Sequence, residues 1–175
     1  MKTIIKNEEN LKDEQIEETV TRVKVFFINS NNEIMLASSA GGFQLPGGHV
    51  ENGEKYSETI IREMKEETGI TLNDNEVGEP FLCVDTLKKS SWSGKNRLSR
   101  ILYFLIRSNK TPNINEINLT DNEKANNFCV KFVPYNDFYA VVNDIKCNNA
   151  YEANRSIASE ILFSFEELKE YLNKK

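Results

Sequence analysis

Apolar and β-branched residues alternate with polar ones over residues 18–28, and this period of two predicts a strand. The next four residues, 29–32, are asparagine and serine, which favour turns, and a second apolar run follows at 33–37. Two apolar runs joined by such a turn predict a β-hairpin. Residues 2–17, which precede it, are polar and acidic, and we expect either a short helix or a loosely held lead-in there.

A helical period replaces the alternation at residues 55–68, where Ile60, Ile61 and Met64 share one apolar side that would face a sheet. We expect the remaining elements in this order: strands at 76–87, 98–107 and 128–133, then helices at 134–142, 152–163 and 165–172. The last helix would begin at a capping box, formed by Ser164 and Glu167. Strands around one central helix, with further helices for the other face, predict an α/β fold, a three-layer α/β/α sandwich with a mixed central sheet.

The central helix carries three carboxylates, Glu63, Glu66 and Glu67, at a spacing of i, i+3 and i+4 that places them on one face. Like charges at this spacing repel by about 0.2–0.5 kcal/mol per pair, so the arrangement is locally unfavourable. A hard divalent cation would offset the repulsion, and an all-oxygen ligand set favours Mg²⁺ or Mn²⁺. A solvated acidic helix face is the alternative interpretation of the carboxylates alone.

A glycine-rich loop at residues 41–48 lies directly before this helix. Paired glycines allow the backbone to approach a ligand closely or to adopt a positive φ, and Pro46 stiffens the entry. The loop could be an ordinary connection, but its place before an acidic helix suits contact with phosphate or metal through backbone atoms. His49, which follows the loop, we expect to be a solvated residue.

Residues 48–70 resemble the Nudix box, Gly-x5-Glu-x7-Arg-Glu-U-x-Glu-Glu-x-Gly-U, in which U is a bulky aliphatic residue. Every position of the pattern is matched, by Gly48, Glu54, Arg62, Glu63, Met64, Glu66, Glu67, Gly69 and Ile70. So many identities at fixed spacing form a far more specific motif than the carboxylates alone. The resemblance implies a MutT-like Nudix hydrolase with the Nudix fold, and it extends in general form over residues 18–170.

The resemblance implies that Glu63, Glu66 and Glu67 hold Mg²⁺, with Mn²⁺ as a second choice, and that the backbone carbonyl of Gly48 joins the metal shell. In several Nudix hydrolases a glutamate in a later loop is an extra metal ligand or general base, and Glu123 matches it by its place in the fold. Either Glu63 or Glu123 would therefore be the general base.

Arg62 lies beside the carboxylates on the same helix. A guanidinium can bind a carboxylate through two hydrogen bonds, so we expect Arg62 to orient Glu54 or a ligand glutamate rather than to contact substrate. A plain surface arginine is the alternative that the complete box argues against. Glu54 and Gly69 are expected to have structural roles within the box.

The implied reaction is hydrolysis of a nucleoside diphosphate linked to another group. The family's ADP-ribose subgroup has a proline about sixteen residues beyond the box, where this chain has Thr86, and the tyrosine of the dinucleoside-polyphosphate subgroup is also missing there. A (deoxy)nucleoside triphosphate pyrophosphohydrolase that releases a nucleoside monophosphate and pyrophosphate is the first choice. The alternatives are an ADP-ribose, nucleotide-sugar or RNA 5′-end pyrophosphohydrolase, or a Nudix module that senses a nucleotide without cleaving it.

Five further residues are candidates for substrate contact: Arg22, Phe43, Lys88, Trp92 and Arg97. The last three lie in the basic connection between the expected strands at 76–87 and 98–107. Cations there could bind phosphate while the tryptophan stacks on a base. A solvated hairpin tip is an equal alternative.

The bulk composition fits one Nudix domain over residues 1–175, with 39% hydrophobic and 28% charged residues. A net charge of −5 argues against broad binding of nucleic acid or anionic membranes, so a nucleotide is the expected partner and RNA is not favoured. Three widely spaced cysteines and the lack of an apolar leader favour a cytoplasmic protein with reduced thiols. A homodimer is as compatible with the sequence as a monomer.

Overall fold

The alternating runs build one mixed sheet in the computed structural model, which describes residues 1–119, 121, 125 and 128–174. In this described part the strands are β1 (Lys2–Lys6), β2 (Glu18–Ile28), β3 (Glu33–Ser39), β4 (Gly42–Gln44), β5 (Leu82–Lys89), β6 (Asn96–Arg107) and β7 (Cys129–Pro134). The helices are α1 (Tyr56–Thr68), α3 (Tyr135–Asn148) and α4 (Glu152–Asn173), and short 3₁₀ helices lie at Asp13–Gln15, Asp74–Glu76 and Ile114–Glu116.

The strands lie in the order β1-β5-β6-β2-β3-β4, and β7 also pairs with β3. β2 runs parallel to β6 along its whole length, and β1 runs parallel to β5. β5 is antiparallel to β6, and β3 is antiparallel to each of its neighbours. Both directions occur in one sheet, so the predicted mixed sheet is confirmed.

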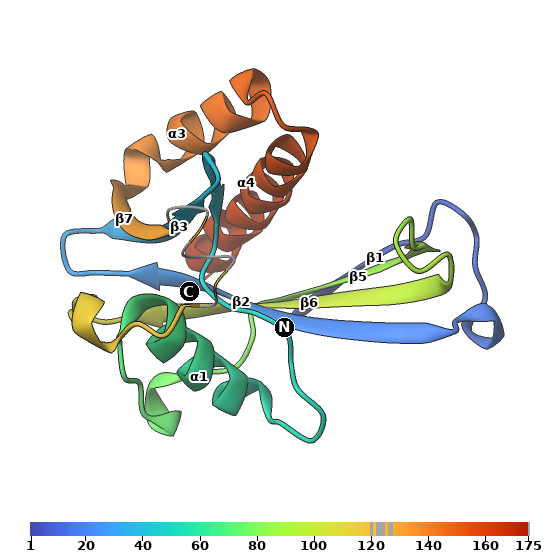
Figure 1. The fold of residues 1–175 in the computed structure, drawn as a ribbon, viewed down its shortest axis with the longest axis horizontal. Coiled ribbons are helices and arrows are strands. Elements are labelled where there is room, and N and C mark those ends of the chain that lie inside the picture. Colours follow the sequence, from blue (N-terminus) through green and yellow to red (C-terminus); the bar gives the residue numbers. More distant parts are fainter. Residues whose placement is uncertain (120, 122–124, 126–127, 175) are drawn as a thin grey trace.

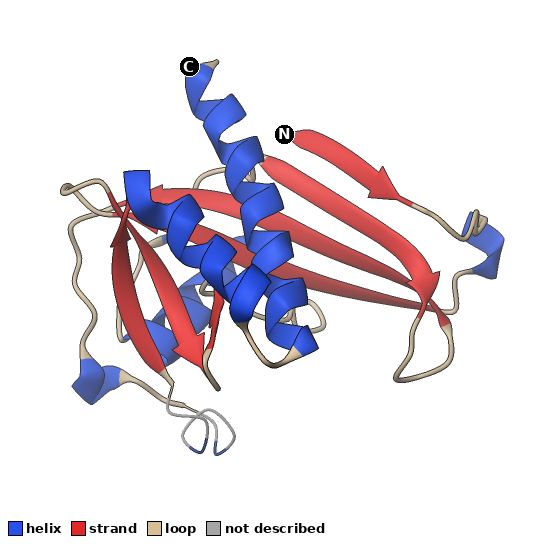
Figure 2. Ribbon diagram, turned by 90° about the horizontal axis from the view of Figure 1, so that it is seen from above, coloured by secondary structure: helices blue, strands red, loops and turns tan. Residues whose placement is uncertain are grey.

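Each face of the sheet has its own core, because successive side chains of a strand point to opposite faces. In β2, Val23 and Phe27 pack in a cluster with Ile60 of α1. Phe26, between them, points the other way and lies 6.3 Å, ring centre to ring centre, from Phe165 of α4. Helix α1 therefore covers one face, while α3 and α4 cover the other (Figures 1 and 2). The predicted α/β/α layers are confirmed.

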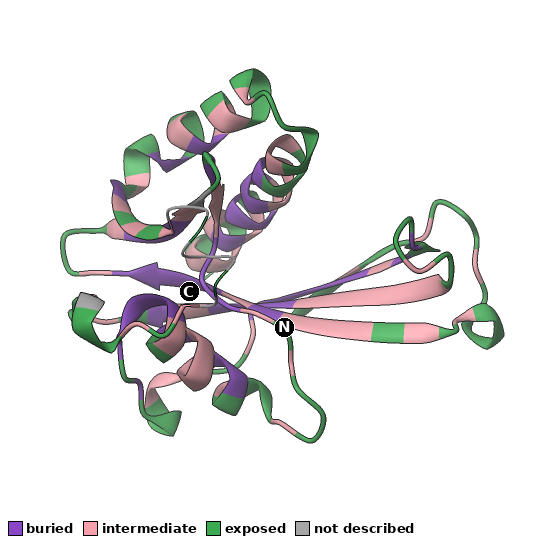
Figure 3. Cartoon of the chain, viewed as in Figure 1, coloured by how far each residue is buried: buried purple, intermediate pink, exposed green. Residues whose placement is uncertain are grey.

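Beyond the helices, the long strands β2, β5 and β6 continue as an extension toward the right of Figure 1. Burial decreases along this extension, where the strands change from buried to intermediate residues in Figure 3. The site described below lies near the middle of β2, beside Arg22 and Lys24.

The sheet divides next to β2, and the glycine-rich loop fills the gap. β2 pairs with β3 only at Ile28 and Ile34. Farther back along β2, residues 45–50 run beside it instead: the amide of Val23 donates to the Gly48 carbonyl at 3.0 Å, and the amide of Val25 donates to the Pro46 carbonyl at 2.9 Å. The loop before α1 is thus fixed to the central strand by backbone hydrogen bonds.

Several parts of the chain differ from the sequence prediction. Residues 2–6 form strand β1, because they pair with β5 from far along the chain. The capping box expected at Ser164 does not form, since α4 is one continuous helix in which Ser164 is buried and its hydroxyl donates to the Ile161 carbonyl at 3.0 Å.

The strand expected at 76–87 begins later, at Leu82, and continues to Lys89, while β6 begins at Asn96. Lys88 and Arg97 therefore face each other as paired strand residues rather than lying in a long loop. Helix α3 also runs to Asn148, beyond the predicted end at residue 142. Across the described residues, no helix combines the length and apolar character that a membrane span requires.

Gly69 ends α1 with a φ of +70°, and a Cβ there would overlap the carbonyl oxygen of Asn113. We expect Gly69→Ala to lower the free energy of unfolding by about 2–4 kcal/mol, through left-handed strain plus the backbone overlap. Gly53→Ala is the matched control, because its φ is +83° with open space around the Cβ position. It should cost only about 1–2 kcal/mol. Urea unfolding measures both, and equal losses would contradict this account.

Candidate active site

A cavity of about 360 Å³ opens where the glycine-rich loop meets β2 and α1. Its lining combines cations, carboxylates and glycines: Arg22, Lys24, Gln44, Gly47, Gly48, His49, Glu51, Arg62, Glu63 and Glu67. The cations Arg22 and Lys24 come from β2, and the carboxylates Glu63 and Glu67 come from α1. The loop and the acidic helix, which the sequence predicted to be two halves of a site, thus border one space.

Glu63 of α1 lies directly against the glycine loop. A Cβ on Gly48 would overlap the Glu63 carboxylate, so only glycine leaves room for an oxygen at this place. Arg62 Nη1 donates to Glu63 Oε1 at 2.7 Å and to Glu66 Oε2 at 3.3 Å. Burial raises the pKa of the Glu63 carboxyl above its ordinary value, and the neighbouring guanidinium opposes this rise.

Arg62 is held by Glu54 through two hydrogen bonds, from Nε to Oε1 at 2.9 Å and from Nη2 to Oε2 at 3.0 Å. The Arg62 guanidinium lowers the pKa of Glu54 to about 2, and the same pair raises the pKa of Arg62. Nη2 also donates to the carbonyl of His49 at 3.1 Å. The structure therefore places Arg62 as a bridge from the loop to the carboxylates.

Glu67 is the most deeply placed carboxylate of the helix, with 5% of the residue exposed. Its Oε2 accepts a hydrogen bond from the amide of Gly47 at 3.0 Å. Gly47 has a φ of +124°, and a Cβ there would overlap the carbonyl of Val23. Glycine is thus required for the loop to pass between β2 and α1 and to present its amide to Glu67.

The cationic side of the cavity comes from β2. Lys24 Nζ donates to the carbonyls of Leu45 and Gly47, each at 3.0 Å, and so fixes the loop from the side opposite to the helix. Arg22 Nε donates to Nε2 of His49 at 3.1 Å. Burial and the charge of Arg22 lower the pKa of His49, which favours its neutral form. His49 is exposed, as expected, but it belongs to the cavity wall.

Sequence reasoning missed Lys24 as a site residue. The signal available in the sequence was a lysine between two valines of a predicted strand. In the structure both valines, Val23 and Val25, are fully buried. Sequence reasoning also missed Gln44, which only the short strand β4 brings to the cavity. Neither residue belongs to the box of residues 48–70, so the motif does not identify them.

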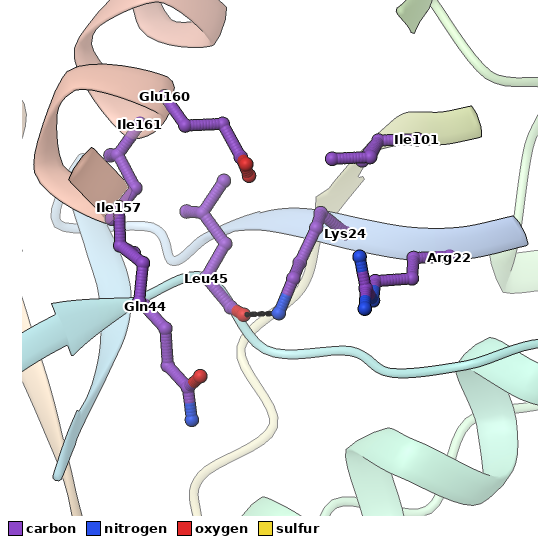
Figure 4. A pocket seen from close by; sticks show the side chains of 8 residues that line it. All are labelled: Arg22, Lys24, Gln44, Leu45, Ile101, Ile157, Glu160 and Ile161. Carbon is purple, nitrogen blue, oxygen red and sulfur yellow. Dashed lines mark hydrogen bonds between the residues drawn. The ribbon is translucent and has the colours of Figure 1, made fainter. Parts of the chain in front are cut away.

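A second cavity of about 260 Å³ adjoins the first and shares Arg22, Lys24 and Gln44 with it (Figure 4). Its remaining lining is mostly apolar and comes from the loop, β6 and α4: Leu45, Ile101, Ile157, Glu160 and Ile161. Together the two cavities run from the acidic helix α1 to helix α4.

The oxygen donors of the first cavity suit a hard divalent cation by their chemistry. Among the described residues, no three histidine, cysteine, aspartate or glutamate side chains lie in an arrangement that could hold a metal ion. Arg62 supplies the positive charge between Glu63 and Glu66 instead. The Glu63 carboxylate lies close against Gly48, and this contact is the structural feature that fits a metal site here.

The structure brings Arg22 to the cavity but not the other four candidates for substrate contact. Phe43 packs against the apolar cluster on the α3 and α4 face. Arg97 donates to Glu18 at 2.6 Å. Glu18 precedes Arg22 by four positions along β2, a distance of about 13 Å at the usual rise of a strand. Lys88 pairs with Arg97, and Trp92 is 90% exposed in the hairpin turn beyond them.

Glu123, the second candidate for the general base, lies outside the described residues.

A family model described as NUDIX domain matches residues 18–156. Nudix hydrolase 25 of Arabidopsis thaliana is 30% identical over 116 residues, which cover 61% of this chain and 66% of that protein. An ADP-ribose pyrophosphatase of Methanocaldococcus jannaschii is 46% identical over 48 residues, which cover 25% of this chain and 28% of that protein. The chain thus spans less than two thirds of either relative.

Two solved structures show the same fold. The MutT protein from Methanosarcina mazei Go1 has a TM-score of 0.53 at 19% identity, covering 91% of this chain and 99% of its own. The MutT NUDIX hydrolase from Burkholderia pseudomallei has a TM-score of 0.52 at 17% identity, covering 82% of this chain and 98% of its own. At these identities the likeness concerns the fold alone, and the predicted Nudix fold is confirmed.

The pair formed by Glu54 and Arg62 makes stability depend on acid pH. Because the folded-state pKa of Glu54, about 2, lies below its ordinary value of 4.5, the ionised carboxylate contributes stability above about pH 5 that is lost as the pH falls through 2. We expect Glu54→Gln to be less stable than the parent protein at pH 7, with a difference that shrinks between pH 5 and pH 2. Urea unfolding at each pH measures it.

Glu79→Gln is the control for this comparison, since Glu79 is exposed and lies outside the cavity. Parallel curves of stability against pH for Glu54→Gln and the parent protein would contradict the proposed role of the pair.

Proposed function

Because the chain belongs to the Nudix family, we propose that it is a metal-dependent pyrophosphohydrolase acting on a nucleoside diphosphate linked to another group. Within that class we propose a (deoxy)nucleoside triphosphate as substrate, cleaved to a nucleoside monophosphate and pyrophosphate. One observation carries the proposal: the carboxylates Glu63 and Glu67 and the cations Arg22 and Lys24 line the same cavity. Transfer of a phosphoryl group to water requires cations that bind the phosphate and carboxylates that bind the metal.

We propose that Glu63, Glu66 and Glu67 hold Mg²⁺ together with the carbonyl of Gly48, and Mn²⁺ would suit the same oxygens. The Gly48 carbonyl accepts the Val23 amide and keeps its second lone pair for a further ligand. When bound, the metal would neutralise charge on the phosphates and lower the pKa of the attacking water.

The chain's own cations would position the substrate. Lys24 is fixed by two carbonyls, and Arg22 is fixed through Nε, so the Nη groups of Arg22 stay directed at the cavity as donors for phosphate oxygens. Arg62 has a different task, because Glu54 and Glu63 already occupy its donors. It would hold Glu63 in place rather than bind the substrate.

The general base would be Glu63 or Glu123. Burial raises the pKa of Glu63, which makes its carboxylate a stronger base than an exposed glutamate.

A related substrate, ADP-ribose, is the second candidate, because one relative is named an ADP-ribose pyrophosphatase. It contains the same anhydride bond between two phosphates, so the cavity would need no different chemistry. An RNA 5′ end would also keep the chemistry, but its binding would weaken steeply with salt.

The test is a substrate panel for the purified protein with Mg²⁺. It contains the deoxynucleoside triphosphates and their oxidised forms, ADP-ribose, nucleotide sugars, dinucleoside polyphosphates and 5′-triphosphate RNA, with products resolved by chromatography. We expect a triphosphate to be preferred and to yield pyrophosphate. Glu67→Gln should lower kcat at least about 100-fold, because it removes one metal-binding carboxylate.

Preferred cleavage of ADP-ribose would replace the triphosphate assignment. Tight nucleotide binding without turnover of any substrate would replace the enzyme by a nucleotide sensor.

Metal binding can be measured without activity. At Mg²⁺ concentrations near 100 times its Kd, we expect stabilisation of about 2.7 kcal/mol, which corresponds to a rise in Tm of about 5–11 °C for a chain of this size. Glu67→Gln should abolish most of this rise, whereas the control Glu79→Gln should keep it. Differential scanning calorimetry with and without Mg²⁺ measures the shift. An unchanged shift in Glu67→Gln would remove Glu67 from the proposed ligand set.

A further inference from the structure

The second cavity has the features of a base-binding site, and its use as one rests on the proposed nucleotide function. It shares Arg22, Lys24 and Gln44 with the cavity that would hold the phosphates. A nucleotide with its phosphates beside α1 would therefore extend its sugar and base past β2 toward α4.

The walls of this cavity suit a flat ring. Leu45 comes from the loop, Ile101 from β6, and Ile157 and Ile161 from successive turns of α4. Figure 4 shows these apolar side chains on opposite sides of one space. Apolar walls with a few polar groups are typical of small-molecule sites. They would contact the faces of a base without distinguishing one base from another.

One carboxylate enters this apolar space. Figure 4 shows the Glu160 carboxylate pointing from α4 toward the gap between Leu45 and Ile101. The hydroxyl of Tyr103 donates to its Oε1 at 3.2 Å, and Tyr103 is 1% exposed, so this contact is fixed from inside the core. No other described residue donates a hydrogen bond to Glu160, and the remaining lone pairs of the carboxylate stay available to a ligand.

An ionised carboxylate only accepts hydrogen bonds, and this decides which base edge it can bind. Guanine presents two adjacent donors on its pairing edge, the ring N1–H and the exocyclic N2 amino group. Adenine and cytosine place a ring acceptor beside their amino group, and uracil places carbonyl oxygens on both sides of its N–H. Two donors matched to two carboxylate oxygens form the strong, two-bond type of contact.

We propose that Glu160, positioned by Tyr103, selects a guanine nucleotide as the substrate. Glu160 would touch the base directly, while Tyr103 acts through it as a positioning residue. Both residues lie outside the motif that predicts the chemistry of the first cavity.

The experiment is calorimetric titration with the α,β-methylene analogues of GTP, ATP, CTP and UTP in the presence of Mg²⁺, since these analogues resist cleavage at the first anhydride. We expect the parent protein to bind the guanine analogue most tightly. Glu160→Gln should weaken that binding by about 10–100-fold, the size of one lost two-bond contact. It should also strengthen binding of the adenine analogue, because an amide offers the donor and acceptor that adenine matches.

Two further variants separate recognition from stability. Glu166→Gln is the matched control on the same helix, because Glu166 is exposed and pairs with Lys169. It should leave all four affinities unchanged. Tyr103→Phe should weaken guanine binding by a smaller factor, about 3–10-fold, because it removes the hydrogen bond that positions Glu160 but leaves the carboxylate itself in place, without gain for adenine.

Equal affinity for all four analogues in the parent protein, or an equal loss for all four in Glu160→Gln, would overturn the guanine assignment. The proposed function fails differently: guanine binding that depends on Glu160, without hydrolysis of any triphosphate, would overturn the enzyme and keep this inference. Hydrolysis of triphosphates with no preference for a base would overturn this inference and keep the enzyme.

Discussion

The ion pairs of Arg62 are the interaction on which the site depends. Like charges on one helix face repel, and Nη1 of Arg62 contacts both Glu63 and Glu66, so one guanidinium offsets that repulsion. Its other donors bind both oxygens of Glu54 and the carbonyl of His49. A lysine could not replace these contacts, because a single ammonium group cannot bind a carboxylate in this forked way. Arg62 therefore joins helix, loop and carboxylates into one unit.

The second constraint is the division of the sheet beside β2. β2 gives up its pairing with β3 after one residue pair and takes residues 45–50 as its neighbour instead. That exchange places the loop between a buried strand and the acidic helix, and Lys24 fixes it from the strand side through two carbonyls. Both cavities lie along this line, the first bordered by α1 and the second by α4. The position of the site is thus a property of the sheet as much as of the motif.

Local sequence patterns predicted the local secondary structure. The helix at α1 and the spacing of its carboxylates follow from period and sequence distance, and the alternation at β2 follows from a period of two. Strand β1 escaped prediction because its partner β5 lies far along the chain. Ser164 has the composition of a helix cap, but burial between α4 and the sheet keeps the helix continuous through it. Long-range packing decided both cases.

The two cavities also explain why the box predicts the chemistry but not the substrate. The carboxylates of α1 lie within one and a half helical turns, so a short motif contains them. The second cavity is assembled from the loop, β6 and α4, whose residues meet only in the folded chain. Glu160 at the α4 end would repel phosphate, whereas Arg22 and Lys24 of β2, which both cavities share, attract it. This difference in charge would therefore fix the direction in which a nucleotide enters, with its base toward α4 and its phosphates toward β2 and α1.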